Sequence, residues 1–192
     1  MPTENELKFV LDLRFAQDLK DLKDKKVQIT ELERLLAEPD PIKQAYLYGD
    51  TSLSVRIRGV YHAVEHFSLT LKQKLNDRTV EVEAEIPERD FKDLWDTSTE
   101  HLIKDRHFLY ATRDGTDYMW EIDLFRDENG RCYFVQAEHE MPEGQAEPLF
   151  IPDLIQRYLL HAVPRKYTGD FSSRKLSDVG YAEHMYDRLK AQ

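Results

Sequence analysis

Glu4-Asn5-Glu6-Leu7-Lys8 opens the chain and begins a predicted strand over residues 4–12. Successive side chains of a strand point to opposite faces, so Glu4, Glu6 and Lys8 share one face and the apolar residues between them share the other. Such a charged row suits either a face exposed to solvent or the wall of a charged cavity. The charged rows of the later strands decide between these two interpretations.

The composition indicates one folded domain, expected to span residues 1–192. Hydrophobic residues make up 41% and charged residues 33% of the chain, which suits a core beneath a charged surface. The net charge of −10 argues against a nucleic-acid partner, because such proteins are usually basic. Cys132 is the only cysteine, which excludes an intrachain disulfide and a cysteine-based metal cluster. With no apolar run of membrane-spanning length and no signal peptide, we expect a cytoplasmic protein without a membrane partner; a homodimer is compatible with the sequence.

Alternation of apolar and charged residues predicts strands through most of the chain. The predicted strands lie at residues 4–12, 44–48, 53–60, 65–75, 79–86, 106–113, 117–126 and 131–140, with hairpin turns at Asp114-Gly115 and Asn129-Gly130. Helical spacing is seen at residues 15–38, 88–97, 151–161 and 176–190, with a loop at 164–173. About eight strands suit a barrel that can hold a small ligand. The expected fold class is therefore α+β, an eight-stranded antiparallel closed β-barrel covered by peripheral helices.

Nearly every predicted strand pairs an apolar row with a row of ionised residues. The charged rows contain Lys8, Arg56, Arg58, Lys72, Lys74 and Arg113 as cations and Glu4, Glu6, Glu81, Glu83, Glu85, Glu121, Asp123, Glu138 and Glu140 as anions. Amphipathic helices need an apolar surface to cover, which favours a tunnel with the charges inside. Neighbouring Arg-x-Arg and Lys-x-Lys rows would repel each other without an anion between them. Paired carboxylates also offer oxygen ligands to Mg²⁺ or Mn²⁺.

Taken in order, these motifs resemble those of the CYTH superfamily, the triphosphate tunnel metalloenzymes. The resemblance rests on Glu4-x-Glu6-x-Lys8, Arg56-x-Arg58, Lys72, Glu81-x-Glu83, Arg113, Trp120-Glu121-Ile122-Asp123, Ala137-Glu138-His139-Glu140 and Tyr167-Thr168-Gly169-Asp170. Two positions depart from the family pattern. Ala111 stands where the Lys-x-Arg strand usually has its lysine, and the arginine that commonly follows Thr-Gly-Asp is missing.

The resemblance implies a tunnel that binds a linear triphosphate, or the triphosphate of a nucleotide or thiamine, together with Mg²⁺ or Mn²⁺. The implied phosphate ligands are Arg56, Arg58, Lys72, Lys74 and Arg113. The implied metal ligands are Glu4, Glu6, Glu81, Glu83, Glu138 and Glu140, and the implied catalytic set is Lys8, Glu4 and Glu6. Lys8 would orient the attacking water or steady the adjacent carboxylates. Glu81 and Glu83 would bind a second metal or hold basic side chains in place.

The leading hypothesis for the function is a metal-dependent triphosphate hydrolase. Inorganic triphosphate is the simplest substrate, because the motifs require no element that recognises a base. One alternative is a class IV type adenylyl cyclase, which needs an adenine pocket that the sequence does not identify. The other is a non-catalytic module that binds polyphosphate or a nucleotide, and Ala111 keeps it open by removing one expected cation.

Overall fold

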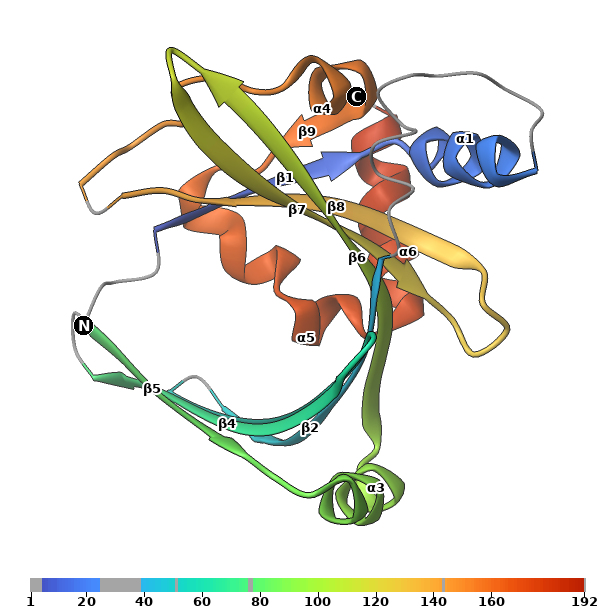
Figure 1. Ribbon diagram of the computed structural model, residues 1–192, viewed down its shortest axis with the longest axis vertical. Helices are drawn as coiled ribbons and strands as arrows, with labels where there is room; N and C mark the ends of the chain where they lie inside the picture. The colour runs from blue at the N-terminus through green and yellow to red at the C-terminus, as the bar shows by residue number, and fades with distance from the viewer. Residues whose placement is uncertain (1–4, 25–38, 51, 76–77, 143, 192) are drawn as a thin grey trace.

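A curled antiparallel sheet forms the centre of the computed structural model, which describes residues 5–24, 39–50, 52–75, 78–142 and 144–191 (Figure 1). Its strands are β1 (Glu6–Leu11), β2 (Asp40–Gly49), β3 (Leu53–Tyr61), β4 (Glu65–Leu75), β5 (Arg78–Glu85), β6 (Glu100–Arg113), β7 (Thr116–Arg126), β8 (Cys132–Glu140) and β9 (Leu159–Ala162). They lie side by side in the order β5-β4-β3-β2-β6-β7-β8-β1-β9. This confirms the α+β class with an antiparallel sheet.

The sheet is open, so the expected eight-stranded closed barrel is not found. Within the described residues the sheet has nine strands, and no hydrogen-bonded pairing joins its edge strands β5 and β9. Strand count did not predict closure, because closure depends on pairing between strands that are distant in the sequence.

The ninth strand, β9, lies at the end of the segment 151–161, where the sequence predicts one helix. Helix α4 (Asp153–Tyr158) ends there, and the chain then pairs with β1. Val163 N donates to the Lys8 carbonyl at 2.9 Å, just beyond β9. A buried strand needs partners for its backbone groups on both sides, and this need outweighs the local helical spacing.

β2 and β6 both begin earlier than predicted, at Asp40 and Glu100 instead of 44 and 106. The two strands pair with each other along this added length, from Asp40 opposite Arg106 to Tyr46 opposite Glu100. Their pairing joins the half of the sheet formed by β2 to β5 to the half formed by the remaining strands.

Helices cover the outer face of the sheet and one end of its other face. The helical elements are α1 (Arg14–Lys23), α3 (Glu88–Thr97), α4, the 3-10 helix η1 (Arg165–Phe171), α5 (Ser173–Leu176) and α6 (Val179–Lys190). Of the helical segment predicted at 15–38, the first part is confirmed as α1, and residues 25–38 lie outside the described residues. η1 occupies most of the predicted loop at 164–173. None of the described helices has the length and apolar character needed to cross a membrane.

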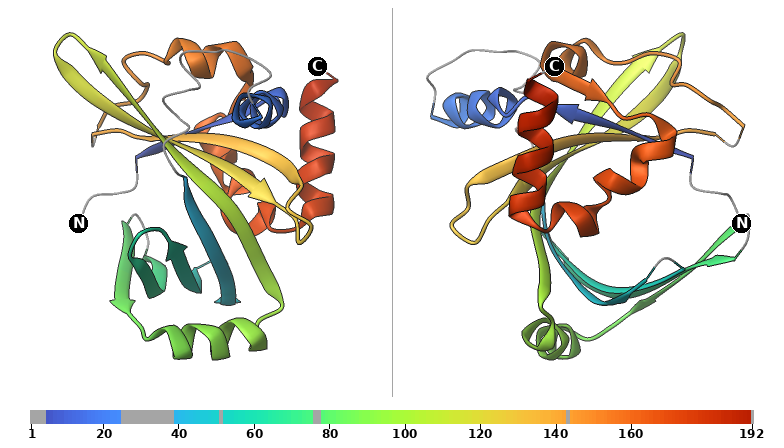
Figure 2. Two further views of the ribbon diagram at one scale, coloured as in Figure 1. Left: turned by 45° about the vertical axis from the view of Figure 1, so that its right-hand side comes forward. Right: turned by 180° about the vertical axis from the view of Figure 1, so that it is seen from behind.

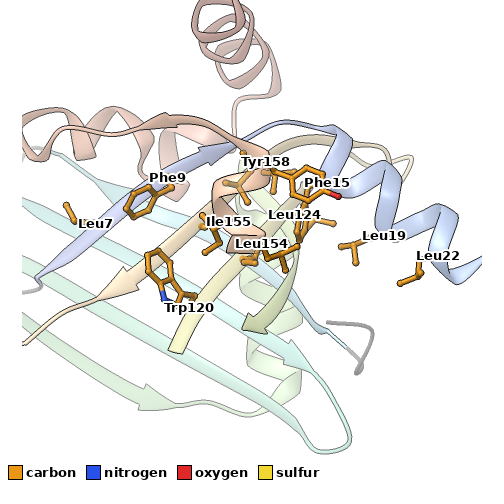
Figure 3. Close-up of a cluster of buried hydrophobic side chains, with 14 of the residues drawn as sticks. Leu7, Phe9, Phe15, Leu19, Leu22, Trp120, Leu124, Leu154, Ile155 and Tyr158 are labelled. Carbon is orange, nitrogen blue, oxygen red and sulfur yellow. The ribbon is translucent and has the colours of Figure 1, made fainter. Parts of the chain in front are cut away.

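The apolar row of β1 packs on the outer face beneath α1 and α4 (Figure 3). Leu7, Phe9 and Leu11 are all buried there, and the Phe9 ring lies 5.4 Å from the Trp120 ring, centre to centre. Burying one such side chain contributes about 1.5–3 kcal/mol. This packing turns the charged row of β1 to the opposite face of the sheet.

Helix α3 covers the outer face of the other half of the sheet (Figure 2). Phe91 of α3 is buried against Ile57 and Phe67. Gly59 permits this close approach, since a Cβ there would lie 3.1 Å from the Phe67 ring and 3.2 Å from the Phe91 ring.

The C-terminal elements cover one end of the face opposite the outer one. Their buried cluster comprises Val10, Leu102, Phe125, Tyr133, Phe134, Val163, Phe171, Leu176, Ala182 and Tyr186. In this cluster, apolar side chains of the strands pack against apolar side chains of η1, α5 and α6. They fill the space at that end of the face. The charged side chains occupy the rest of the same face.

Candidate active site

One face of the sheet, which we call the inner face, carries charged side chains on neighbouring strands. Residues directly opposite each other in an antiparallel pair share a face, so the register traces this face from strand to strand. For example, Lys8 lies opposite Glu138, and Asp123 lies opposite Arg106. The inner face includes Glu6, Lys8, Gln44, Tyr46, Arg56, Arg58, Lys72, Lys74, Glu81, Glu83, Lys104, Arg106, Glu121, Asp123, Gln136, Glu138 and Glu140.

Two cations of the inner face come from β6, at positions that sequence reasoning missed. Lys104 Nζ lies 2.5 Å from Asp123 Oδ2. Arg106 donates to the same carboxylate through Nε and Nη2, each at 2.7 Å, and also contacts Glu121. Lys104 and Arg106 therefore provide a Lys-x-Arg pair on the inner face.

Arg113, the residue predicted for this role, lies on the outer face. Register places Arg113 opposite Thr116 and Ala111 opposite Tyr118, in phase with the buried Trp120. The Arg113 side chain is 57% exposed, and its guanidinium lies 5.3 Å from the centre of the Phe150 ring. The structure does not bring Arg113 into the cationic cluster, and Ala111 does not interrupt that cluster.

The buried group Lys104, Asp123 and Arg106 is held together by mutual charge compensation. Burial opposes ionisation of Asp123, but Lys104 and Arg106 outweigh it and lower the pKa of this carboxyl. Burial likewise opposes the charge on Arg106, but Asp123 and Glu121 outweigh it and raise the pKa of the guanidinium. Burial lowers the pKa of Lys104 to about 8, against the opposing charge of Asp123. All three groups are therefore charged at neutral pH, and removing Asp123 would leave the buried Lys104 without its ion-pair partner.

Arg56 and Arg58 of β3 carry hydrogen-bond donors that lack an anionic partner in the described part of the chain. Arg58 forms no ion pair with a described carboxylate, and its Nε donates to Gln44 Oε1 at 3.1 Å. Burial and the charges of Arg56 and Arg106 lower the pKa of Arg58 to about 10. Arg56 lies 3.5 Å from Glu81 through Nη2, but its buried Nε has no hydrogen-bond partner in the described part of the chain. An anion beside these two residues would satisfy the donors and compensate the charge.

The predicted residues of β4 and β5 form a second group on the inner face. Lys72 Nζ lies 3.4 Å from Glu81 Oε2, so Glu81 contacts both Lys72 and Arg56. Thr70 donates to Glu83 Oε2 at 2.9 Å. Lys74 lies in the same row but is exposed near the end of β4. These contacts support the interpretation in which Glu81 holds basic side chains in place.

Lys8 connects the carboxylates of β1 and β8. Its Nζ lies 2.5 Å from Glu6 Oε1 and contacts Glu138 Oε1, which also accepts from Gln136 Nε2 at 2.5 Å. Burial opposes the charge on Lys8, but Glu138 and Glu6 outweigh it and raise the pKa of Lys8. Burial also opposes ionisation of Glu138, but Lys8 lowers the pKa of that carboxyl. Lys8 is therefore a fixed ammonium group and not a base.

Three predicted metal ligands lie on adjoining strands of the inner face. Glu6 lies opposite Glu140, and Glu138 lies opposite Glu121. These oxygen donors fit the preference of Mg²⁺ and Mn²⁺. Within the described residues, no three acidic, histidine or cysteine side chains converge closely enough to hold a metal. Glu4, the remaining predicted ligand of this wall, lies outside the described residues.

The chain has the same fold as solved structures that it matches over most of its length. The similar solved structures include two of NE1496, one of them described as the inorganic triphosphatase NE1496. Each is 20% identical, with a TM-score of 0.55, and the match covers 91% of this chain and 97% of that chain. PH1819 from Pyrococcus horikoshii OT3 is 18% identical, with a TM-score of 0.45, over 73% of this chain and 80% of that chain. No family model and no curated protein matches the chain. At this identity the likeness to NE1496 establishes the fold alone.

Proposed function

We propose that the protein binds a triphosphate on its inner face and hydrolyses it with Mg²⁺ or Mn²⁺. The observation that carries this proposal is the half-buried Arg58, which forms no ion pair with a carboxylate among the described residues and whose pKa is lowered by burial and by the charges of Arg56 and Arg106. A linear triphosphate carries several negative charges and many acceptor oxygens. It therefore matches a row of cations from β3 and β6 better than a singly charged anion does.

The cations have different roles in this proposal. Arg56 and Arg58 would bind phosphoryl oxygens with their planar guanidinium groups, and Lys72 would add a point charge beside them. Arg106 is engaged by Asp123 and Glu121, so it contributes positive charge at a fixed place. Positioning and charge neutralisation of this kind are what phosphoryl transfer chiefly requires.

Glu6, Glu138 and Glu140, with Glu4, are the residues that we propose to hold the metal. A bound Mg²⁺ or Mn²⁺ would supply polarisation of a phosphoryl oxygen and orientation of the attacking water. Lys8 holds Glu6 and Glu138 in place through its ion pairs with both carboxylates. Its ammonium group also faces the side of the sheet on which the triphosphate would lie.

Inorganic triphosphate is the proposed substrate. The motifs found in the sequence bind phosphate and metal and include none for a base. The name of NE1496, inorganic triphosphatase, supports the same choice, although that name describes only the similar protein.

Phosphate release from tripolyphosphate tests this proposal. Purified protein is assayed with Mg²⁺ or Mn²⁺, and again with excess EDTA. We expect release that depends on the metal, and a loss of about 10²–10³-fold in Arg58→Ala, the usual cost of removing one preorganised donor. Arg113→Ala is the matched control, because it removes the same side chain from the outer face, and its activity should stay within about twofold of wild type. No release with either metal, or equal loss in both variants, would contradict the proposal.

A further inference from the structure

Hydrogen bonds link Arg58 to Gln44 and Gln44 to Tyr46, and the donor in each bond can be assigned. The buried Gln44 accepts from Arg58 Nε at 3.1 Å, and its Nε2 donates to Tyr46 Oη at 2.5 Å. A guanidinium can only donate, so the amide oxygen of Gln44 must face Arg58. The amide nitrogen then faces Tyr46, and the tyrosine hydroxyl must be the acceptor of that bond.

The Tyr46 hydroxyl keeps a proton that Gln44 cannot accept. Burial raises the pKa of Tyr46 to about 12 against the opposing charges of Arg56 and Arg58, so the phenol is neutral. The hydroxyl has no hydrogen-bond acceptor among the described residues. The charged groups that act on it, Arg56, Arg58 and Arg174, are all cations and cannot accept.

The ring of Tyr46 is also contacted by the guanidinium of Arg174. The Arg174 guanidinium lies 5.8 Å from the ring centre and donates to both Glu100 oxygens, at 2.7 and 2.9 Å. Glu100 itself lies opposite Tyr46 in the β2–β6 pair. With only 7% of the residue exposed, the hydroxyl stays on the inner face beside Arg56 and Arg58.

We propose that Tyr46 donates its hydroxyl proton to a phosphoryl oxygen of the triphosphate, and that Gln44 positions both Tyr46 and Arg58 for this contact. The proposed function supplies the identity of the anion. The geometry supplies the donor, because among the described residues Arg56 Nε is buried without a hydrogen-bond partner and the neighbouring Tyr46 Oη, which accepts from Gln44, has no acceptor for its own proton. Tyr46 thus becomes a substrate-binding residue and Gln44 a positioning residue.

Calorimetric titration with tripolyphosphate in the presence of EDTA tests the donor directly. A hydrogen bond to a charged acceptor corresponds to about a 10- to 100-fold change in affinity, so we expect Tyr46→Phe to weaken binding by that factor. Tyr48→Phe is the matched control on the same strand, since its hydroxyl already donates to Asp50 Oδ2 at 2.9 Å. Its Kd should stay within about twofold of wild type. The melting temperatures of both variants are measured to confirm that they fold.

A second variant, Gln44→Glu, distinguishes hydrogen-bond donation by the Tyr46 hydroxyl from a role of that hydroxyl in packing. The new carboxylate can accept from Arg58 and from Tyr46 at once, so it takes the proton that wild type keeps for the anion. In the Gln44→Glu background, Tyr46→Phe should change Kd by no more than about twofold. In wild type the same substitution should raise Kd by about 10- to 100-fold. A hydroxyl that matters only for packing would cost the same in both backgrounds.

The outcomes distinguish this proposal from the proposed function. Weakened binding in Tyr46→Phe that disappears in the Gln44→Glu background supports the proposal, whether or not the wild type releases phosphate. Equal binding by wild type and Tyr46→Phe, or an equal cost in both backgrounds, overturns it and leaves the hydrolase proposal standing. A wild type that does not bind tripolyphosphate in EDTA overturns this proposal, whereas the hydrolase proposal is overturned only by the absence of metal-dependent phosphate release.

Discussion

Asp123 is fully buried on β7 and contacts two cations of β6. Desolvation of these ions is costly, so the group is stable only while its charges remain paired. Because the carboxylate fixes both Lys104 and Arg106, it also determines where positive charge lies on the inner face.

Replacing this carboxylate should be strongly destabilising. Asp123→Ala removes the ion-pair partner of Lys104, and we expect a loss of about 3–5 kcal/mol in the free energy of unfolding. Urea denaturation measures this loss. Asp93→Ala, which changes an exposed aspartate of α3, should cost no more than about 0.5 kcal/mol. Similar costs in the two variants would show that the buried group is not held by charge.

Stability should fall in acid because Asp123 and Glu138 have lowered pKa values. Unfolded carboxyl groups take up protons near their ordinary pKa of about 4, while these two stay ionised in the folded protein to lower pH. The unfolded state therefore binds more protons as the pH falls, and the free energy of unfolding decreases from about pH 5 downward. Melting temperatures measured from neutral pH into this range test the prediction. Glu138→Gln should flatten the decrease; an unchanged slope would rule out a contribution from Glu138.

At the scale of elements, the β6–β7 hairpin explains why two site residues were missed. The turn Asp114-Gly115 was identified correctly, and a two-residue turn fixes the register of both strands. Counting back from it places Arg106 opposite Asp123 and Arg113 opposite Thr116, as observed. The signal was thus available, but the strand was predicted to start at Arg106, which excluded Lys104. Its charged row was assigned through Arg113, which lies on the opposite face from Arg106, so Arg106 was missed as well.

Most other strands and the helices α1 and α3 could be predicted because their side-chain periodicity reports directly which face is buried. β9 could not, since Leu154, Ile155 and Tyr158 have helical spacing and the following four residues carry no distinct pattern. Its strand conformation comes from pairing with β1, a distant segment. The metal ligand set is a different case, because Glu4 lies outside the described residues and its role stays a prediction.

The packing of α3 on the sheet depends on Gly59. Gly59→Val would place side-chain atoms against the rings of Phe67 and Phe91, and we expect a cost of about 1–3 kcal/mol from overpacking. Gly169→Val is the control, since a Cβ at the exposed Gly169 meets nothing within 4 Å. The shift in urea midpoint of each variant measures the effect. Equal shifts would indicate that α3 does not pack closely on this strand.

On the scale of the whole molecule, two halves with separate cores share one inner face. The buried clusters beneath α1 and α4 and beside α6 stabilise one half, and the cluster beneath α3 stabilises the other. The β2–β6 pairing joins the halves, so Arg106 from one lies close enough to Arg58 from the other for its charge to lower the pKa of Arg58. A triphosphate bound there would interact with both halves.

Tripolyphosphate should therefore stabilise the folded protein. At about 100 times Kd, a ligand that binds only the folded state adds about 2.7 kcal/mol, which raises the melting temperature by roughly 5–10 °C for a domain of this size. The rise should shrink at high salt, because the cations are partly screened. Thermal unfolding with and without tripolyphosphate measures the effect. A rise of the same size in Arg58→Ala would mean that the anion binds elsewhere.

A crystal structure with tripolyphosphate bound tests the central claim most directly. We predict phosphoryl oxygens within hydrogen-bond distance of Arg56 Nε, the Arg58 guanidinium and Tyr46 Oη, on the same face as Lys104 and Arg106. Tripolyphosphate bound beside Arg113 or elsewhere on the outer face, with the inner-face arginines unchanged, would contradict the claim.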